Sequence, residues 1–308
     1  MNPVARALKD NLALVMRGKD QVIEYMLVAL FANGHVLLED VPGVGKTTLA
    51  KALARSLQGE YHRIQFTPDL LPTDITGGMI YSPQTGEFTY RPGPVFCNIL
   101  LGDEINRASP RTQSALLEAM SEYQVSIEGE RRPLPKPFFV LATQNPVEYH
   151  GTYPLPEAQL DRFAMRLEIG YPDAAAEIAI VDTQRDHHPL DDLQPVATTQ
   201  DILEIQAEVR AVTVEPTLVR YLTEIIRATR EDSRLQLGAS PRAALLLHRT
   251  SQALAFLRGR DYAIPDDVQE LAPVVVSHRL VLETKASYSG ISKRDVVLDL
   301  LGTVPVPA

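Results

Sequence analysis

Residues 40–48 read Asp40-Val41-Pro42-Gly43-Val44-Gly45-Lys46-Thr47-Thr48, and this stretch decides the fold. It lies between an apolar run over His35–Glu39 and a helix-forming run over Thr48–Leu57. A strand that turns through glycines into a helix directs backbone N–H groups and the positive end of the helix dipole at one point. This context predicts a phosphate-binding loop rather than an ordinary turn with a surface lysine.

The loop offers a cation and a hydroxyl group to a nucleotide. We expect Lys46 to reach the β- and γ-phosphates and Thr47 to bind Mg²⁺. The usual G-x-x-x-x-G-K-[ST] spacing has glycine at position 40, where this chain has Asp40; aspartate tolerates unusual turn dihedrals, so the loop can still close. The residues expected to contact the nucleotide are Pro42, Gly43, Val44, Gly45, Lys46, Thr47 and Thr48.

The composition is that of a globular protein with about two domains. The chain has 308 residues, 45% of them hydrophobic, which is enough for a sizeable core. Its net charge of −9 argues against broad electrostatic binding to nucleic acid or to an anionic membrane. The single Cys97 lies in an apolar run and indicates a reducing compartment, most simply the cytoplasm. We expect no signal peptide and no membrane span.

Short apolar strands alternate with helical patterns from residue 35 to 170, which favours a three-layer α/β domain with a five-stranded parallel sheet. Beyond a Pro- and Asp-rich linker, amphipathic runs without any strand pattern indicate a small all-α domain. The expected domains are residues 1–172, a helix and linker over 173–197, and the helical part over 198–308. The expected strands are His35–Glu39, Tyr61–Phe66, Asn98–Leu101, Phe138–Ala142 and Met165–Ile169, and the expected later helices are Ala174–Arg185, Thr199–Val212, Pro216–Arg230, Ser240–Arg258 and Pro265–Leu280.

Two carboxylates, Asp103 and Glu104, end one of the expected strands. Ligands of a parallel sheet collect at the carboxyl ends of its strands, so both acids can lie beside the phosphates. Asp103 would anchor Mg²⁺ through its water shell, and Glu104 would accept a proton from the water that attacks the γ-phosphorus. A solvated acidic turn is the alternative, but its coincidence with the phosphate loop favours a phosphoryl-transfer site.

Polar residues also end the two neighbouring strands. Asn145 could hydrogen-bond the attacking water or the γ-phosphate, although Asn145-Pro146 could equally be a simple turn. Gln65 could hold Glu104 in an inactive state, but a structural role is the interpretation we favour.

Two arginines complete the pattern. Arg162 follows Asp161 just before the last strand, where it could reach the γ-phosphate on a neighbouring subunit, or form a salt bridge with Asp161 or Glu157. Arg242 falls in the first turn of a helix capped by Ser240. A cation is unfavourable there, which suggests that Arg242 binds a phosphate elsewhere.

These motifs, in this order, resemble those of AAA+ ATPases, and the wording of four runs resembles that of the MoxR family over about residues 10–282. By this resemblance, Asp103 and Glu104 are Walker B residues, Asn145 is sensor 1, Arg162 is the arginine finger and Arg242 is sensor 2. The all-α part is then the lid. The four runs are Val41–Thr47, Asp103–Arg107, Ala142–Pro146 and Pro156–Phe163.

Two further segments resemble hairpin insertions of that family, near residues 74–94 and 122–137. The first pairs Met79–Tyr81 with Phe88–Tyr90 around a Gln84-Thr85-Gly86 turn, and the second has its tip at Glu128–Glu130. In the family such hairpins line the axial face of a ring and contact a client or partner; packing as decoration on the sheet is the alternative. The Ala174–Arg185 helix resembles an insertion that displaces the lid, so Arg242 could act on a neighbour's nucleotide.

The resemblance implies an enzyme that hydrolyses MgATP, binds ATP/ADP and Mg²⁺, and assembles into a hexameric ring. It also implies chaperone-like action on a protein client, with von Willebrand factor A-domain partners and metal or cofactor insertion. One alternative is an I-type subunit of a metal chelatase. A DNA helicase or translocase would use the same motor, with Arg131-Arg132 near a hairpin tip touching phosphate. A nucleotide-gated adaptor with little turnover is a third alternative, against which Glu104 argues.

Overall fold

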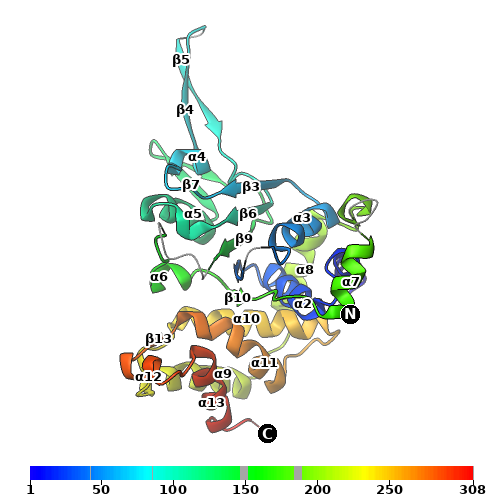
Figure 1. Ribbon diagram of the computed structural model, residues 1–308, viewed down its shortest axis with the longest axis vertical. Helices are drawn as coiled ribbons and strands as arrows, with labels where there is room; N and C mark the ends of the chain where they lie inside the picture. The colour runs from blue at the N-terminus through cyan, green and yellow to red at the C-terminus, as the bar shows by residue number, and fades with distance from the viewer. Residues whose placement is uncertain (42, 85, 146–151, 184–188, 308) are drawn as a thin grey trace.

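The computed structural model describes residues 1–41, 43–84, 86–145, 152–183 and 189–307. Within them, a five-stranded sheet with the strand order β10-β1-β9-β6-β3 forms the centre, and all its neighbouring strands are parallel. Helices cover both faces of the sheet (Figure 1), which confirms the predicted three-layer α/β fold. The strands are β1 (Val36–Glu39), β3 (Tyr61–Gln65), β6 (Ile99–Asp103), β9 (Phe139–Gln144) and β10 (Met165–Leu167).

Each predicted strand is present, with ends shifted by a residue or two. Strands β6 and β9 continue past their apolar residues because Asp103 still pairs with Gln65, and Gln144 with Glu39, in the parallel ladder. A hydrophobic pattern does not report such polar strand ends, since the backbone supplies the pairing.

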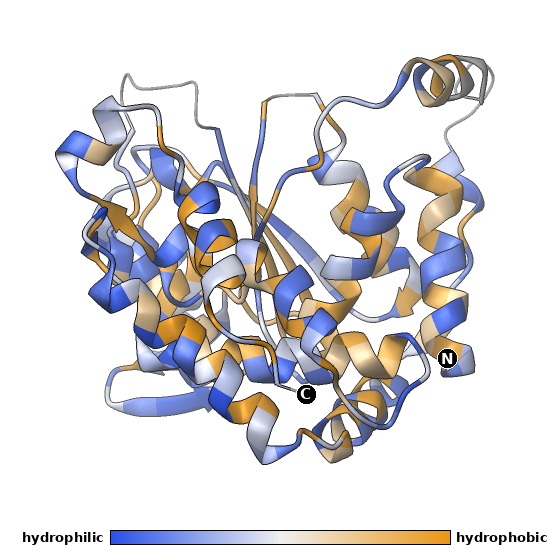
Figure 2. Ribbon diagram, turned by 90° about the horizontal axis from the view of Figure 1, so that it is seen from below, coloured by the Kyte–Doolittle hydropathy of each residue, from blue (hydrophilic) through white to orange (hydrophobic). Residues whose placement is uncertain are grey.

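The two faces of the sheet enter different apolar clusters. Val36 and Leu38 of β1 belong to the cluster that contains the helix after the phosphate loop, whereas Leu37 belongs to the cluster on the opposite face. This alternation is the period of two that a strand imposes, and Figure 2 shows apolar stretches, in orange, along the central strands and on the helices around them. The helices of this region are α1 (Pro3–Val15), α2 (Asp20–Phe31), α3 (Lys46–Ser56), α4 (Pro72–Thr76), α5 (Pro110–Glu122) and α6 (Glu157–Leu160), with a 3-10 turn η1 (Ile105–Arg107).

Both predicted hairpins are present. Strands β4 (Gly77–Ser82) and β5 (Glu87–Pro92) form a two-stranded ribbon that projects from the rest of the chain (Figure 1). Strands β7 (Gln124–Ile127) and β8 (Glu130–Pro133) form the second ribbon. Thr85, in the predicted turn of the first hairpin, lies outside the described residues.

The C-terminal part is mainly helical, as predicted; in Figure 1 the helices α9 to α13 lie below the sheet, whereas α7 and α8 lie to its right, near α2 and α3. The expectation that it contains no strands is wrong, because short strands pair there and at its start. Their length, two or three residues each, is too short for a periodic pattern. The elements are α7 (Ala174–Thr183), η2 (Pro189–Asp192), α8 (Thr199–Ala211), α9 (Pro216–Glu231), α10 (Pro241–Leu257), α11 (Pro265–Val276), η3 (Ser277–Arg279), α12 (Thr284–Tyr288) and α13 (Lys293–Thr303), with strand pairs β11 (Ala197–Thr198) with β2 (Leu57–Gln58), and β12 (Leu235–Leu237) with β13 (Val281–Leu282).

Candidate functional site

The phosphate loop joins β1 to α3, and two of its glycines have backbone angles that other residues disfavour. Gly43 and Gly45 have φ values of 85° and 98°, in the left-handed region where a Cβ atom causes strain. Gly45 is the N-cap of α3, so the helix begins at Lys46, slightly before the predicted Thr48. The N-terminus of α3 therefore faces the loop, which is the arrangement that binds phosphate.

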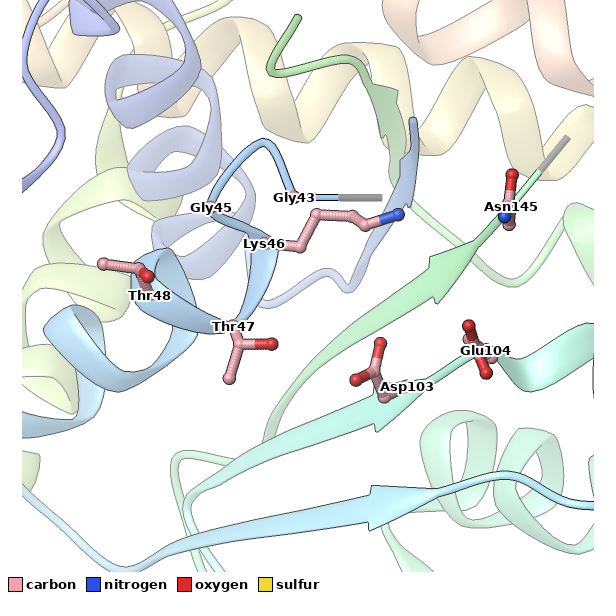
Figure 3. Close-up of a pocket in the computed structure, with 8 residues that line it drawn as sticks. All are labelled: Gly43, Gly45, Lys46, Thr47, Thr48, Asp103, Glu104 and Asn145. Carbon is pink, nitrogen blue, oxygen red and sulfur yellow. The ribbon is translucent and has the colours of Figure 1, made fainter. Parts of the chain in front are cut away.

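The loop borders a cavity of about 310 Å³ that brings together most of the predicted site. In Figure 3 the Thr47 hydroxyl points across this cavity toward Asp103. Val44 is not among the lining residues and packs instead against the apolar cluster, and Pro42 lies outside the described residues. The lining residues are Gly43, Gly45, Lys46, Thr47, Thr48, Asp103, Glu104 and Asn145.

Asp40, at the position usually held by glycine, ties the loop to the end of β10. Its Oδ2 accepts hydrogen bonds from the backbone N–H groups of Ile169 (2.7 Å) and Gly170 (2.6 Å), and its Oδ1 accepts one from Val41 (2.9 Å). The Asp40 carbonyl oxygen accepts a hydrogen bond from Lys46 Nζ at 2.8 Å. The loop therefore closes with aspartate at this position. The carboxylate accepts hydrogen bonds from three backbone N–H groups, and a glycine here would offer these groups no side-chain acceptor.

Strand β6 delivers Asp103 to the cavity with both carboxylate oxygens engaged. Thr143 Oγ1 donates to Asp103 Oδ1 at 2.6 Å, and Arg63 Nη2 donates to Asp103 Oδ2 at 2.6 Å. Carboxylate and hydroxyl oxygens are the ligands that Mg²⁺ prefers, and it is commonly held by one or two of them together with substrate phosphates. Asp103 and Thr47 line the same cavity and supply this donor set.

Glu104 has a φ of 57°, a left-handed value that is uncommon for a residue with a side chain. Its backbone N–H donates to Thr143 Oγ1 at 2.8 Å. Its Oε2 accepts hydrogen bonds from Gln65 Nε2 (2.8 Å) and Arg107 Nη1 (3.0 Å). The structure thus places Gln65 in contact with Glu104. From the sequence, this contact was the less favoured interpretation and a purely structural role for Gln65 the favoured one.

Asn145 follows β9 and is 4% exposed at the edge of the cavity. Its amide lies on the same side of the sheet as the phosphate loop and the two acids (Figure 3). Pro146 is outside the described residues. The Asn145 side chain is therefore placed where it could contact a bound phosphate or water.

Arg162 does not line this cavity. Its Nη1 donates to the Leu117 carbonyl oxygen (2.5 Å) and to Ser121 Oγ (2.6 Å) on α5. The neighbouring Asp161 pairs with Arg279 Nε at 3.0 Å and accepts a hydrogen bond from Ser240 Oγ at 2.9 Å. Arg162 is thus next to a contact that joins the segment before β10 to the helical part.

Arg242 is exposed in the first turn of α10, two residues after Ser240. Burial lowers the pKa of His35 to about 4, and the positive charge of Arg242 contributes to this shift. His35 precedes β1, whereas the phosphate loop follows it. Arg162 stands three residues before β10 begins, and Ser240, two residues before Arg242, hydrogen-bonds Asp161. Since β1 and β10 are parallel, both arginines lie toward the amino ends of the strands, whereas the phosphate loop follows the carboxyl end of β1.

Three residues that contact Asp103 or Glu104 were not predicted from the sequence as part of the site. Thr143 stands next to Gln144 and Asn145 at the end of a strand, and this polar run was the available signal. Arg63 alternates with buried Ile64 on β3, but an exposed arginine on an edge strand carries no signal of its own. Arg107 lies in the family-like Asp103–Arg107 run.

Comparison with known proteins agrees with this geometry. Residues 35–165 match the family model described as "ATPase family associated with various cellular activities (AAA)", and residues 227–300 match an AAA lid domain. The chain is 49% identical to the uncharacterized protein YeaC of Bacillus subtilis, covering 100% of this chain and 96% of that protein. It is 46% identical to chaperone MoxR1 of Mycobacterium tuberculosis, covering 95% and 80% respectively. The chain belongs to the MoxR family of AAA+ ATPases.

A solved structure from Cytophaga hutchinsonii, described provisionally as an ATPase, matches this MoxR-family chain with a TM-score of 0.91 and 41% identity. The match covers 99% of this chain and 95% of that one. It therefore extends across both the sheet and the lid. No helix of the described residues combines the length and apolar character that crossing a membrane would require.

Proposed function

We propose that this MoxR-family chain hydrolyses ATP with Mg²⁺ and that a complete catalytic site needs two subunits. The observation that carries the proposal is the separation of its parts. The phosphate loop, both acids and Asn145 share one cavity, while Arg162 and Arg242 lie toward the opposite ends of the strands. A ring in which each chain offers its arginines to the next would reunite them.

Within one chain, the proposed roles follow the chemistry of the side chains. The loop N–H groups and Lys46 would bind the phosphates. Lys46 would then give up its hydrogen bond to the Asp40 carbonyl oxygen in exchange for a phosphate oxygen. Thr47 and Asp103 would hold Mg²⁺, which neutralises charge on the phosphates. Glu104 would accept the proton of the attacking water, and Asn145 would orient that water.

Arg162 and Arg242 are proposed to stabilise transition-state charge on the neighbouring subunit's γ-phosphate. In the isolated chain Arg162 is held by Leu117 and Ser121, so assembly would exchange these neutral acceptors for phosphate oxygens, which bind a guanidinium more strongly. A closed ring, with six subunits as the family resemblance implies, satisfies every interface of this head-to-tail kind.

The projecting β4–β5 hairpin is proposed to contact a protein client. Met79, Ile80, Tyr81 and Phe88 are all exposed on it, and apolar side chains grouped on a protruding ribbon indicate an interaction surface. Chaperone MoxR1 carries that activity in its name, and we extend a chaperone-like role to this chain. The same proposal includes a von Willebrand factor A-domain partner and a role in metal or cofactor insertion. It also includes a cytoplasmic location and domain boundaries after residues 172 and 197.

The metal-chelatase I-subunit and the DNA translocase remain the competing functions. Neighbouring genes for chelatase subunits, rather than for A-domain proteins, would favour the first. ATPase activity stimulated by single-stranded DNA in a salt-dependent way would favour the second.

Mixing two inactive variants tests the shared site. Lys46→Ala chains retain Arg162, and Arg162→Ala chains retain Lys46, so mixed rings contain some interfaces with both groups intact. We expect ATPase activity to reappear on mixing, while Arg162→Ala alone binds ATP normally and loses up to about 10³-fold in turnover. If subunit exchange is confirmed and no activity returns, a mixture of Arg162→Ala with wild type separates the remaining cases. Activity linear in the wild-type fraction would refute a shared site.

A further inference from the structure

Arg63 on β3 forms the closest charged contact of the Asp103 carboxylate. Its Nη2 lies 2.6 Å from Asp103 Oδ2 and 3.0 Å from Gln65 Oε1. The Arg63 side chain is 44% exposed and that of Asp103 is 13% exposed, so solvent reaches the contact from the Arg63 side. Arg63 is not among the residues that line the cavity.

The sheet register explains why these groups meet. Gln65 pairs with Asp103 and Arg63 with Leu101 in the parallel β3–β6 ladder. Since side chains alternate along a strand, Arg63, Gln65 and Asp103 all project from the face that α3 covers. Buried Ile64 points to the other face, so Arg63 is held beside Asp103 by the backbone itself.

The guanidinium also sets the direction of the Gln65 amide. Because Gln65 Oε1 accepts from Arg63, its Nε2 is the end turned toward Glu104 Oε2, 2.8 Å away. One cation thus neutralises the proposed Mg²⁺ anchor and orders the residue that contacts the proposed base.

We propose that Arg63 is a resident counter-ion of Asp103 that competes with Mg²⁺ and thereby sets the Mg²⁺ concentration needed for nucleotide binding. This inference rests on the proposed function of the site. Each Asp103 oxygen already accepts one hydrogen bond, Oδ1 from Thr143 and Oδ2 from Arg63, and only the second of these donors carries a positive charge. Arg63 and the metal therefore compete for the negative charge of one carboxylate.

The sign of the effect follows from charge. Arg63 repels a divalent cation bound near Asp103 and occupies one of its acceptors. Removal of one such charge near a divalent cation in a largely aqueous setting changes its affinity by about tenfold. A residue that merely oriented Asp103 for the metal would have the opposite effect when removed.

The test measures binding of AMP-PNP, which is not hydrolysed, to the full-length protein over a Mg²⁺ titration. Arg63→Met should lower the Mg²⁺ midpoint by about tenfold, and Arg63→Lys, which keeps the charge, should stay near wild type. Arg107→Met is the matched control, because it removes a cation that contacts Glu104 instead; its shift should not exceed about twofold. Thermal unfolding of each variant checks that it is folded.

A double-mutant cycle isolates the contact. In an Asp103→Asn background, Arg63→Met should move the midpoint by clearly less than in the wild-type background, because only the repulsion between the guanidinium and the metal is then removed. An unchanged or raised midpoint in Arg63→Met, or an equal shift in Arg107→Met, would overturn the proposal. Nucleotide binding that survives Lys46→Ala would instead overturn the phosphate site, so the two failures are distinguishable.

Discussion

Replacement of Asp40 by glycine would restore the residue that the general phosphate-loop pattern has at this position, yet we expect it to weaken the protein. The Asp40 carboxylate accepts hydrogen bonds from Ile169 and Gly170, which lie on a different segment of the chain. Hydrogen bonds to a charged group contribute about 1.5–3 kcal/mol each. The site is partly exposed, so water can replace part of this, and we expect a loss of about 2–4 kcal/mol in the free energy of unfolding.

Urea denaturation, monitored by circular dichroism, measures this loss. The urea concentration at the midpoint of unfolding should fall, while the dependence of the unfolding free energy on urea concentration stays unchanged. Asp40→Asn is the matched control, because it keeps one oxygen acceptor without the charge and should lose about half as much. Lys19 Nζ independently holds the same segment through the Ile169 and Tyr171 carbonyl oxygens, so the chain should remain folded. An Asp40→Gly variant as stable as wild type would refute the role given to this carboxylate.

Three further predictions address the base, the buried ion pair and the buried histidine. Glu104→Gln should preserve nucleotide affinity and slow hydrolysis by about 10² to 10⁴ in a steady-state assay; near-normal turnover would remove Glu104 from the role of base. Asp161→Ala should lower the free energy of unfolding by about 3–5 kcal/mol and Arg279→Met by less, because only the first leaves a guanidinium that is 1% exposed without its counter-ion; equal losses in urea would contradict this. Burial lowers the pKa of His35 to about 4, so its contribution to stability is complete above pH 6.5 and falls by about 3 kcal/mol as the pH drops toward 4. His35→Gln should flatten stability against pH over that range, and an unaltered profile would show that His35 is not the group responsible.

The fold was predictable because its signals are local. Each strand of the sheet is an apolar run bounded by turn residues, and the glycines of the phosphate loop identify the strand that precedes α3. The strands β11, β12 and β13 were not predictable. They consist of two or three residues whose pairing partners lie far away in the chain. So few residues show no hydrophobic periodicity from which a strand could be predicted.

The candidate site was predictable where a motif places a residue at the end of a strand, as for Asp103 and Asn145. The site was not predictable where tertiary packing determines which side chain a residue contacts. Nothing local indicates that Arg63 contacts Asp103 or that Arg279 contacts Asp161, since each pair joins segments distant in sequence. Both hairpins were predicted as elements, but the projection of the β4–β5 hairpin from the rest of the chain was not, because it depends on the direction in which β4 follows α4.

The apolar cluster on the α3 side of the sheet does not stop at the end of the α/β part. Val36 and Leu38 of the sheet belong to the same buried cluster as Leu247 of α10 and Leu271 of α11. A fragment cut between the two parts would carry a bare apolar face on each piece, which favours aggregation over separate folding. Calorimetry of the intact chain should accordingly give one cooperative transition, and clipping within the linker should abolish it instead of yielding two smaller ones.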